Sequence, residues 1–136
     1  MKILQPPDWA LPRGYANGMM AEIQAGSRLL IVSGQIGWNG KCEFETDDFG
    51  LQVAQALRNV VDVLAAGGAK PEHIARMTWY VKDKAEYVGA YGAIGLHYRA
   101  IIGRHFPAMT AVEVADLVEP RAKVEIEVTA VVPPDA

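Results

Sequence analysis

Two carboxylates that could move protons, Glu125 and Glu127, lie in a stretch where charged and apolar side chains alternate. Lys123, Glu125 and Glu127 are charged, whereas residues 124, 126, 128, 130 and 132 are apolar. This alternation is typical of a strand with one buried and one polar face. Partial burial in a cleft raises the pKa of a carboxyl group and suits it to acid–base catalysis. The alternative for Glu125 is a solvated strand face, and Glu127 is interpreted as structural.

Other familiar catalytic patterns are missing from the sequence. Ser33 lies outside a Gly-x-Ser-x-Gly turn, and Gly67-Gly68 follows a predicted helix without the Lys and Ser/Thr of a phosphate-binding loop. The single cysteine, Cys42, allows neither an internal disulfide nor a cysteine-based metal cluster. No histidine pair has metal-ligand spacing among His73, His97 and His105. We therefore expect no metal site and no cofactor.

Charge and composition narrow the classes of partner and compartment. The chain has 13 Lys and Arg against 16 Asp and Glu, for a formal net charge of −3, without a cationic run. Nucleic-acid binding relies on clustered cations, so we expect no nucleic-acid partner. No apolar run approaches the roughly 20 residues of a membrane helix, and the N-terminus lacks a signal-peptide core. Together with the lone thiol, these features predict a cytoplasmic protein without a membrane partner.

The size of the chain predicts one domain over residues 1–136, of which the Pro-rich residues 1–13 form an extended arm. Hydrophobic residues make up 51% of the sequence, and the mean hydropathy is +0.07. That value is high for a small soluble monomer. It indicates that another subunit covers part of the surface.

Hydrophobic periodicity predicts an α+β fold of order ββαβαββ. The expected strands are 19–24, 29–36, 74–81, 110–117 and 122–132. The first helix, 51–66, ends at Gly67-Gly68, and the second begins after the Asp83 cap and ends at Gly103. This order favours one mixed sheet with both helices on one face and a hairpin at each end. The other sheet face then needs a cover, which an oligomer would supply.

Five short segments, taken in order, carry a resemblance to a known family. They are Ile31-Val32-Ser33-Gly34-Gln35-Ile36, Gln55-Ala56-Leu57-Arg58-Asn59-Val60, Thr78-x-Tyr80-Val81-x-Asp83, Pro107-Ala108-x-Thr110-x-Val112-Glu113-Val114-Ala115 and Val124-Glu125-Ile126-Glu127. Over residues 14–132 the chain resembles the RidA family, also called YjgF or Rid. The resemblance implies a chorismate-mutase-like α+β fold, a homotrimer, and small-molecule sites in clefts between subunits. It also implies hydrolysis of reactive enamines and imines, such as 2-aminoacrylate, to a carbonyl compound and ammonia.

The resemblance also assigns roles to individual residues. It implies that Glu125 is the catalytic, water-positioning carboxylate. The implied substrate pocket is lined by Tyr15, Ser33, Gly34, Gln35, Trp38, Met109 and Thr110. For Tyr15 and Trp38 the alternative is packing on the core.

Met109 departs from the family pattern at the position that matters most for substrate charge. The family has an Arg directly after the Pro-Ala pair, and an Arg fork matches a carboxylate in two hydrogen bonds. Methionine cannot pair with a carboxylate and instead lines adaptable apolar pockets. Arg104, close to Pro107, is the first candidate for a replacement cation, ahead of Arg13 and Arg99. The alternative is that it is an ordinary surface arginine.

Three functions follow for comparison. The first is a Rid-type hydrolase whose substrate is larger or less acidic than 2-aminoacrylate, because Met109 replaces the cation. The second is a trimeric protein that binds a small metabolite or acts as a regulator without catalysis. The third, an endoribonuclease or translation inhibitor, is a label attached to relatives in the family, and the net charge of −3 argues against it.

Overall fold

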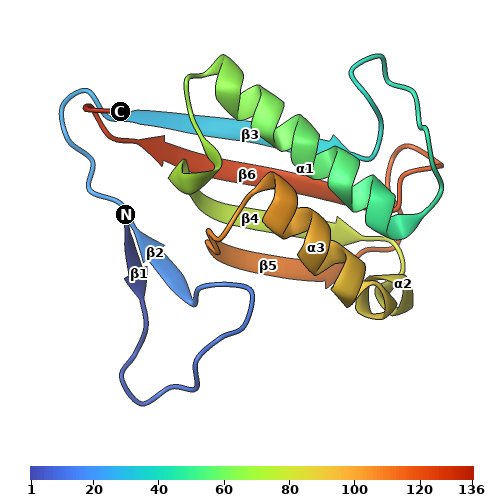
Figure 1. Ribbon diagram of the computed structural model, residues 1–136, viewed down its shortest axis with the longest axis horizontal. Coiled ribbons are helices and arrows are strands. Elements are labelled where there is room, and N and C mark those ends of the chain that lie inside the picture. Colours follow the sequence, from blue (N-terminus) through green and yellow to red (C-terminus); the bar gives the residue numbers. More distant parts are fainter.

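Four strands form the main sheet of the computed structural model, which describes residues 1–136 (Figure 1). They are β3 (Arg28–Ile36), β6 (Val124–Val132), β4 (Ile74–Val81) and β5 (Ala108–Glu113), in that spatial order. The β3–β6 and β6–β4 pairs are antiparallel, whereas β4 and β5 are parallel. The expected mixed sheet is therefore confirmed.

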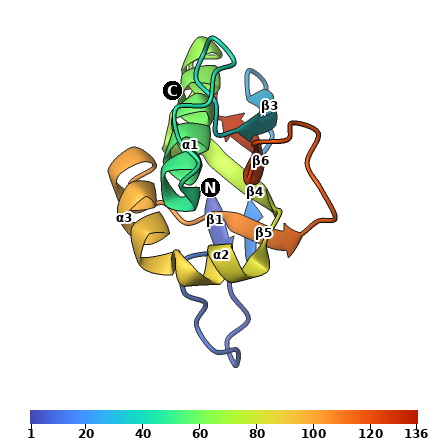
Figure 2. The ribbon, with the colours of Figure 1, turned by 90° about the vertical axis from the view of Figure 1, so that its right-hand side faces the viewer.

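Two helices lie on one face of this sheet, as Figure 2 shows. The two on that face are α1 (Phe49–Ala66) and α3 (Tyr91–Ile101), whereas the short α2 (Lys84–Gly89) lies at the end of the sheet, and a 3-10 turn, Pro71–His73, precedes β4. The core fills the space between α1, α3 and the sheet, and includes Leu57, Leu64, Trp79 and Ile126. None of the helices combines the length and apolar character needed to cross a membrane.

Local signals place α1 where the periodicity predicts it. Asp48 caps the N-terminus, because its Oδ2 accepts a hydrogen bond of 2.9 Å from the backbone N–H of Leu51. The helix ends at Gly67, and Gly68 follows with a φ of 74°, a conformation that favours glycine.

The expected second helix is divided in two. Asp83 begins α2 as predicted, because its Oδ1 accepts from the backbone N–H of Ala85 at 2.8 Å. The helix then stops at Gly89, and α3 begins after Ala90. Glycine lowers helix stability by about 1 kcal/mol relative to alanine, which is consistent with a break at this point.

The expected hairpins at both ends of the sheet are wrong. The short strand β2 (Gly18–Met20) pairs with β1 (Lys2–Leu4), a strand within the arm, and not with β3. At the other end, β6 lies between β3 and β4, so that β5 becomes an edge strand next to β4. Burial explains this placement, since the core-facing residues of β6 are at most 2% exposed, whereas most of β5 is exposed. Periodicity specifies a strand but not its neighbours.

A buried amide ties α1 to the beginning of β6. The side chain of Gln52 is fully buried, and its Nε2 donates to the carbonyl oxygens of Thr46 at 3.1 Å and Arg121 at 3.0 Å. Its Oε1 accepts from the backbone N–H of Lys123 at 2.9 Å. A Cβ at Gly37 would lie 2.6 Å from the Cβ of Gln52, so the chain can pass here only as glycine.

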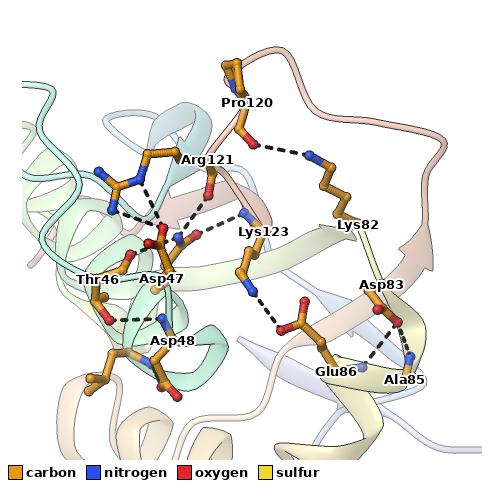
Figure 3. A network of polar contacts seen from close by, with 12 residues as sticks. Thr46, Asp47, Asp48, Lys82, Asp83, Ala85, Glu86, Pro120, Arg121 and Lys123 are labelled. Atoms are coloured by element: carbon orange, nitrogen blue, oxygen red, sulfur yellow. Dashed lines mark hydrogen bonds and ion pairs between the residues drawn. The ribbon is translucent and has the colours of Figure 1, made fainter.

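Ion pairs on the surface also attach the segment before β6 to its neighbours (Figure 3). Arg121 pairs with Asp47 at 3.0 Å, and Lys123 pairs with Glu86 of α2 at 2.8 Å. Ion pairs of this exposure contribute about 0–1 kcal/mol. The buried Gln52 amide is therefore the stronger attachment.

Replacing Gln52 with leucine is expected to lower the free energy of unfolding by about 3 kcal/mol. Leucine fills the space but leaves two carbonyl oxygens and one N–H without partners. Urea denaturation measures the change, with Gln24→Leu in an exposed turn as the matched control. A loss no larger than that of the control would contradict the role given to Gln52.

Candidate functional site

The sheet face opposite the helices has no cover within the chain (Figure 2). On β3, Leu29 is 63% exposed and Ile31 is 77% exposed. Polar side chains occupy the middle of this open face, namely Arg76, Thr78 and Tyr80 from β4 and Glu125, Glu127 and Thr129 from β6. The expected uncovered face is confirmed, and it carries the predicted catalytic carboxylate.

Glu125 lies directly over the backbone of Gly34. A Cβ at Gly34 would overlap with Oε2 of Glu125 and would lie 2.7 Å from its Cγ. The pairing of β3 and β6 steps from Val32/Val128 to Gln35/Ile126, which places one extra residue in β3 as a bulge. The carboxylate of Glu125 is half-buried and has no hydrogen bond or ion pair within the chain. Its oxygens are thus free to bind water or a ligand.

The neighbouring polar residues gather around the same bulge. Gln35 folds back so that its Nε2 donates to the carbonyl oxygen of Ser33 at 3.1 Å and approaches its Oγ at 3.4 Å. Ser33 itself is exposed. We call Ser33, Gly34, Gln35 and Glu125 the Glu125 cluster.

Helix α1 holds the backbone at the end of β3, just after the Glu125 cluster, through the side chain of Asn59. Asn59 donates from Nδ2 to the carbonyl oxygens of Ile36 at 3.1 Å and Trp38 at 2.7 Å. Gln55 orients Asn59, because its Nε2 donates to Oδ1 of Asn59 at 2.8 Å. The ring of Trp38 packs against Phe44 at 5.7 Å between centroids. Trp38 is therefore held as part of the adjoining loop.

The remaining predicted residues lie around the beginning of β5. The loop of Tyr15 is joined to this strand, because Ala16 bridges Ala108, and the Tyr15 side chain is 42% exposed. Thr110 pairs with Thr78, whereas Met109 pairs with Met77 and packs against the core. We call Tyr15, Met109 and Thr110 the Tyr15 cluster.

One chain does not bring the two clusters together. Thr110 and Glu125 lie on opposite sides of β4 and pair with Thr78 and Tyr80. Strand spacing and rise put their Cα atoms about 12 Å apart, and Tyr15, beyond β5, about 20 Å from Glu125. A molecule of a few atoms cannot contact both clusters of the same chain.

Arg104, the first candidate for a replacement cation, does not lie beside Glu125 within the chain. Arg104 is exposed in the turn before β5, next to His105, which is hydrogen-bonded to the carbonyl oxygen of Ile74 at 2.7 Å. Ile74 begins β4, six residues before the Tyr80 partner of Glu125, a separation of about 20 Å. Arg76 lies on the open face, and the alternation of 74–81 was the signal that grouped it with Thr78 and Tyr80.

Glu127 has a structural partner. The Tyr80 hydroxyl donates to its Oε1 at 2.7 Å, and this hydrogen bond raises the pKa of Tyr80 above its ordinary value. The second oxygen of Glu127 has no partner within the chain. The structural interpretation of Glu127 thus accounts for one of its two oxygens.

Comparison with known proteins finds relatives over most of the chain. The family model described as Endoribonuclease L-PSP matches residues 15–132. A 2-iminobutanoate/2-iminopropanoate deaminase of Escherichia coli (strain K12) is 36% identical over 106 residues, which cover 76% of this chain and 79% of the relative. The protein of the same name from Salmonella typhimurium is 35% identical with the same coverage. The crystal structure of the Rid-family protein YyfB from Yersinia pestis, described as of unknown function, has a TM-score of 0.81 at 28% identity, covering 95% of this chain and 96% of that one.

Replacing Gly34 with alanine is expected to displace the Glu125 carboxylate while leaving the fold intact. The new methyl group meets the flexible end of a side chain, which can rotate away, and not a backbone atom. A crystal structure of the variant reads the position of the carboxylate, and thermal unfolding reads the stability. Gly40→Ala is the matched control, since a Cβ there has nothing within 4 Å. An unmoved Glu125 would contradict the packing described.

Proposed function

Because this chain belongs to the Rid (RidA/YjgF) family, we propose that it is an enamine/imine deaminase, which converts a reactive C=N compound to a carbonyl compound and ammonia. The observation that carries the proposal is the unpaired Glu125 carboxylate beside Gly34. The names of the two curated bacterial relatives support the same chemistry. The family model is described as an endoribonuclease, but we do not propose that activity. A chain of net charge −3 without a cationic run lacks the clustered cations that RNA binding needs.

The reaction requires proton transfers, and a single carboxylate can carry them out by accepting and then donating a proton. An enamine first gains a proton on carbon and loses one from nitrogen, which gives the imine. Glu125 then accepts a proton from water as the water oxygen adds to the imine carbon, and returns it to nitrogen. The resulting carbinolamine loses ammonia and leaves the carbonyl compound, so that one water is consumed for each ammonia released. Positioned acid–base catalysis of this kind contributes about 10²–10⁴-fold in rate.

We place the complete site between two copies of the chain. The Glu125 and Tyr15 clusters are too far apart within one chain for a small imine to contact both, as the separations of about 12 and 20 Å show. The Tyr15 cluster of one copy would meet the Glu125 cluster of another across the open sheet face. The exposed Leu29 and Ile31 support burial of this face in an assembly. The family resemblance supports a homotrimer with ligands in its clefts.

The substrate preference in this proposal follows from Met109. No cation occupies the position after Pro107-Ala108, and the methionine presents an adaptable apolar side chain instead. We propose a substrate that is larger or less acidic than 2-aminoacrylate. The single free thiol, Cys42, is consistent with a reducing compartment and supports our proposal that the protein acts in the cytoplasm.

Replacing Glu125 with glutamine is expected to lower the rate of ammonia release at least about 100-fold, because the amide cannot accept the proton from water. Imines made in situ by an amino-acid oxidase serve as substrates, and Glu72→Gln at an exposed position is the control. If the wild-type protein is folded but accelerates no imine of a broad panel, the catalytic proposal is overturned. Saturable binding of a metabolite that Glu125→Gln leaves intact would then favour the non-catalytic alternative.

Replacing Met109 with arginine is expected to raise activity on 2-aminoacrylate by about tenfold or more relative to an uncharged imine. The half-buried position on an edge strand lets the arginine stem pack while its guanidinium reaches water. Met109→Leu is the matched control and should keep the wild-type preference. An unchanged ratio in a folded Met109→Arg protein would show that position 109 does not select substrate charge.

A further inference from the structure

One buried polar group has no partner in the fold, the indole N–H of Trp79. The side chain is 1% exposed, and its Nε1 is the one buried side-chain nitrogen or oxygen without a hydrogen bond. Buried indole N–H groups normally donate to an acceptor, because an unpaired donor loses its bond to water and gains none in return. We therefore looked for an acceptor outside the chain.

The surroundings of Trp79 on the side of the helices are aromatic. Its ring centroid lies 6.3 Å from that of Tyr87, and Tyr87 contacts Phe49 at 6.3 Å and Tyr91 at 5.2 Å. Burial is the main cause that raises the pKa of the Tyr87 hydroxyl. A hydrogen bond formed in such apolar surroundings is stronger than one made in water. An acceptor that reaches the Trp79 N–H would thus gain more than it would at the surface.

Strand β5 leaves space beside this ring. Trp79 pairs with Ala111, just as Met77 pairs with Met109, so these four side chains lie on the same side of the sheet. Trp79 and Met77 are buried, whereas Ala111 is exposed. Neighbouring strands are about 4.8 Å apart, so a small molecule above the methyl group of Ala111 lies against the Trp79 ring.

The same position adjoins the proposed substrate pocket. Met109 precedes Ala111 by two residues, about 7 Å along β5, and belongs to the Tyr15 cluster. The methionine side chain is unbranched and flexible, so it can adapt to a ligand beside it. Trp79 therefore lies within reach of a substrate that contacts Met109.

We propose that Trp79 Nε1 donates a hydrogen bond to the substrate, and that the accepting atom is the oxygen of an uncharged carbonyl group. The inference rests on the proposed deaminase function and specifies its substrate class. That class is an enamine or imine whose carboxyl group is masked as a carboxamide or an ester. The neutral indole donor suits such a group, as an arginine fork would suit a carboxylate.

The charge on β5 favours an uncharged group over a carboxylate. Glu113 is the only charged residue of the strand, and it follows Ala111 by two residues on the same side. Its Oε1 accepts from the backbone N–H of Lys84 at 2.8 Å, which holds the carboxylate in place. A substrate carboxylate above Ala111 would be desolvated near a second negative charge. A carboxamide or ester avoids this penalty and still offers an acceptor.

Nuclear magnetic resonance of the intact protein in its native assembly tests the proposal. The chain has three tryptophans, and Trp79→Phe identifies the indole signal of Trp79. Trp9→Phe and Trp38→Phe identify it by elimination if Trp79→Phe does not fold. Pyruvamide, a stable ketone with a carboxamide, should move the Trp79 indole proton downfield in a saturable way. Methyl pyruvate should do the same, and pyruvate should bind at least about tenfold more weakly.

A substitution on β5 tests the position of the ligand while keeping Trp79. Ala111→Leu fills the space beside the ring from an exposed position and should weaken pyruvamide binding at least about tenfold. Ala65→Leu, at an exposed position of α1, is the matched control and should leave binding unchanged. A Trp79 indole proton that pyruvamide does not move would overturn the proposal. So would pyruvate binding as tight as that of pyruvamide, or full binding in Ala111→Leu.

These binding measurements do not depend on turnover. If no imine is hydrolysed but pyruvamide moves the Trp79 signal, the deaminase proposal fails and Trp79 stands as a ligand-binding donor. If imines are hydrolysed while the Trp79 signal stays unmoved, catalysis stands and the role of Trp79 is overturned.

Discussion

The attachment of α1 to the sheet through side-chain amides is the constraint on which the candidate site depends. Gln52 holds the backbone where β6 begins, and Asn59 holds the backbone where β3 ends. Those two segments carry Glu125 and Gly34, which must contact each other for the carboxylate to be placed. Backbone groups at strand ends have no ladder partners, so buried amides supply what the sheet cannot. Helix α1 therefore fixes the positions of Glu125 and Gly34, although no residue of the helix belongs to the candidate site.

Local elements followed closely from the sequence, because local physics determines them. The strand expected at 74–81 has those bounds in the structure, and the helix expected at 51–66 begins two residues earlier, at Phe49. The strand expected at 110–117 is Ala108–Glu113, and that expected at 19–24 is only Gly18–Met20. Strand partners were not predictable, because the insertion of β6 between β3 and β4 rests on contacts distant in the sequence.

The candidate site was predictable only in part, for a related reason. Alternation placed Glu125 and Glu127 on the polar face of a strand, and the structure has them there. The bulge at Ser33-Gly34 depends on register, which sequence periodicity does not specify. Met109 was grouped with the pocket residues by resemblance alone, and within one chain it packs against the core. Which residues share a site across copies is a property of the assembly.

The extra residue in β3 determines where this strand can change its length. Side chains alternate with a period of two, so one inserted residue reverses which of them face the open side. Before the bulge, Leu29 and Ile31 lie on that side; beyond it, Ile36 is the residue opposite Glu125. Deleting Gly34 would remove the bulge and still leave Gln35 opposite Ile126 and Ile36 opposite Glu125, so that no side chain would change its side of the sheet. The bulge is therefore the place where this strand can lose one residue without a change of register.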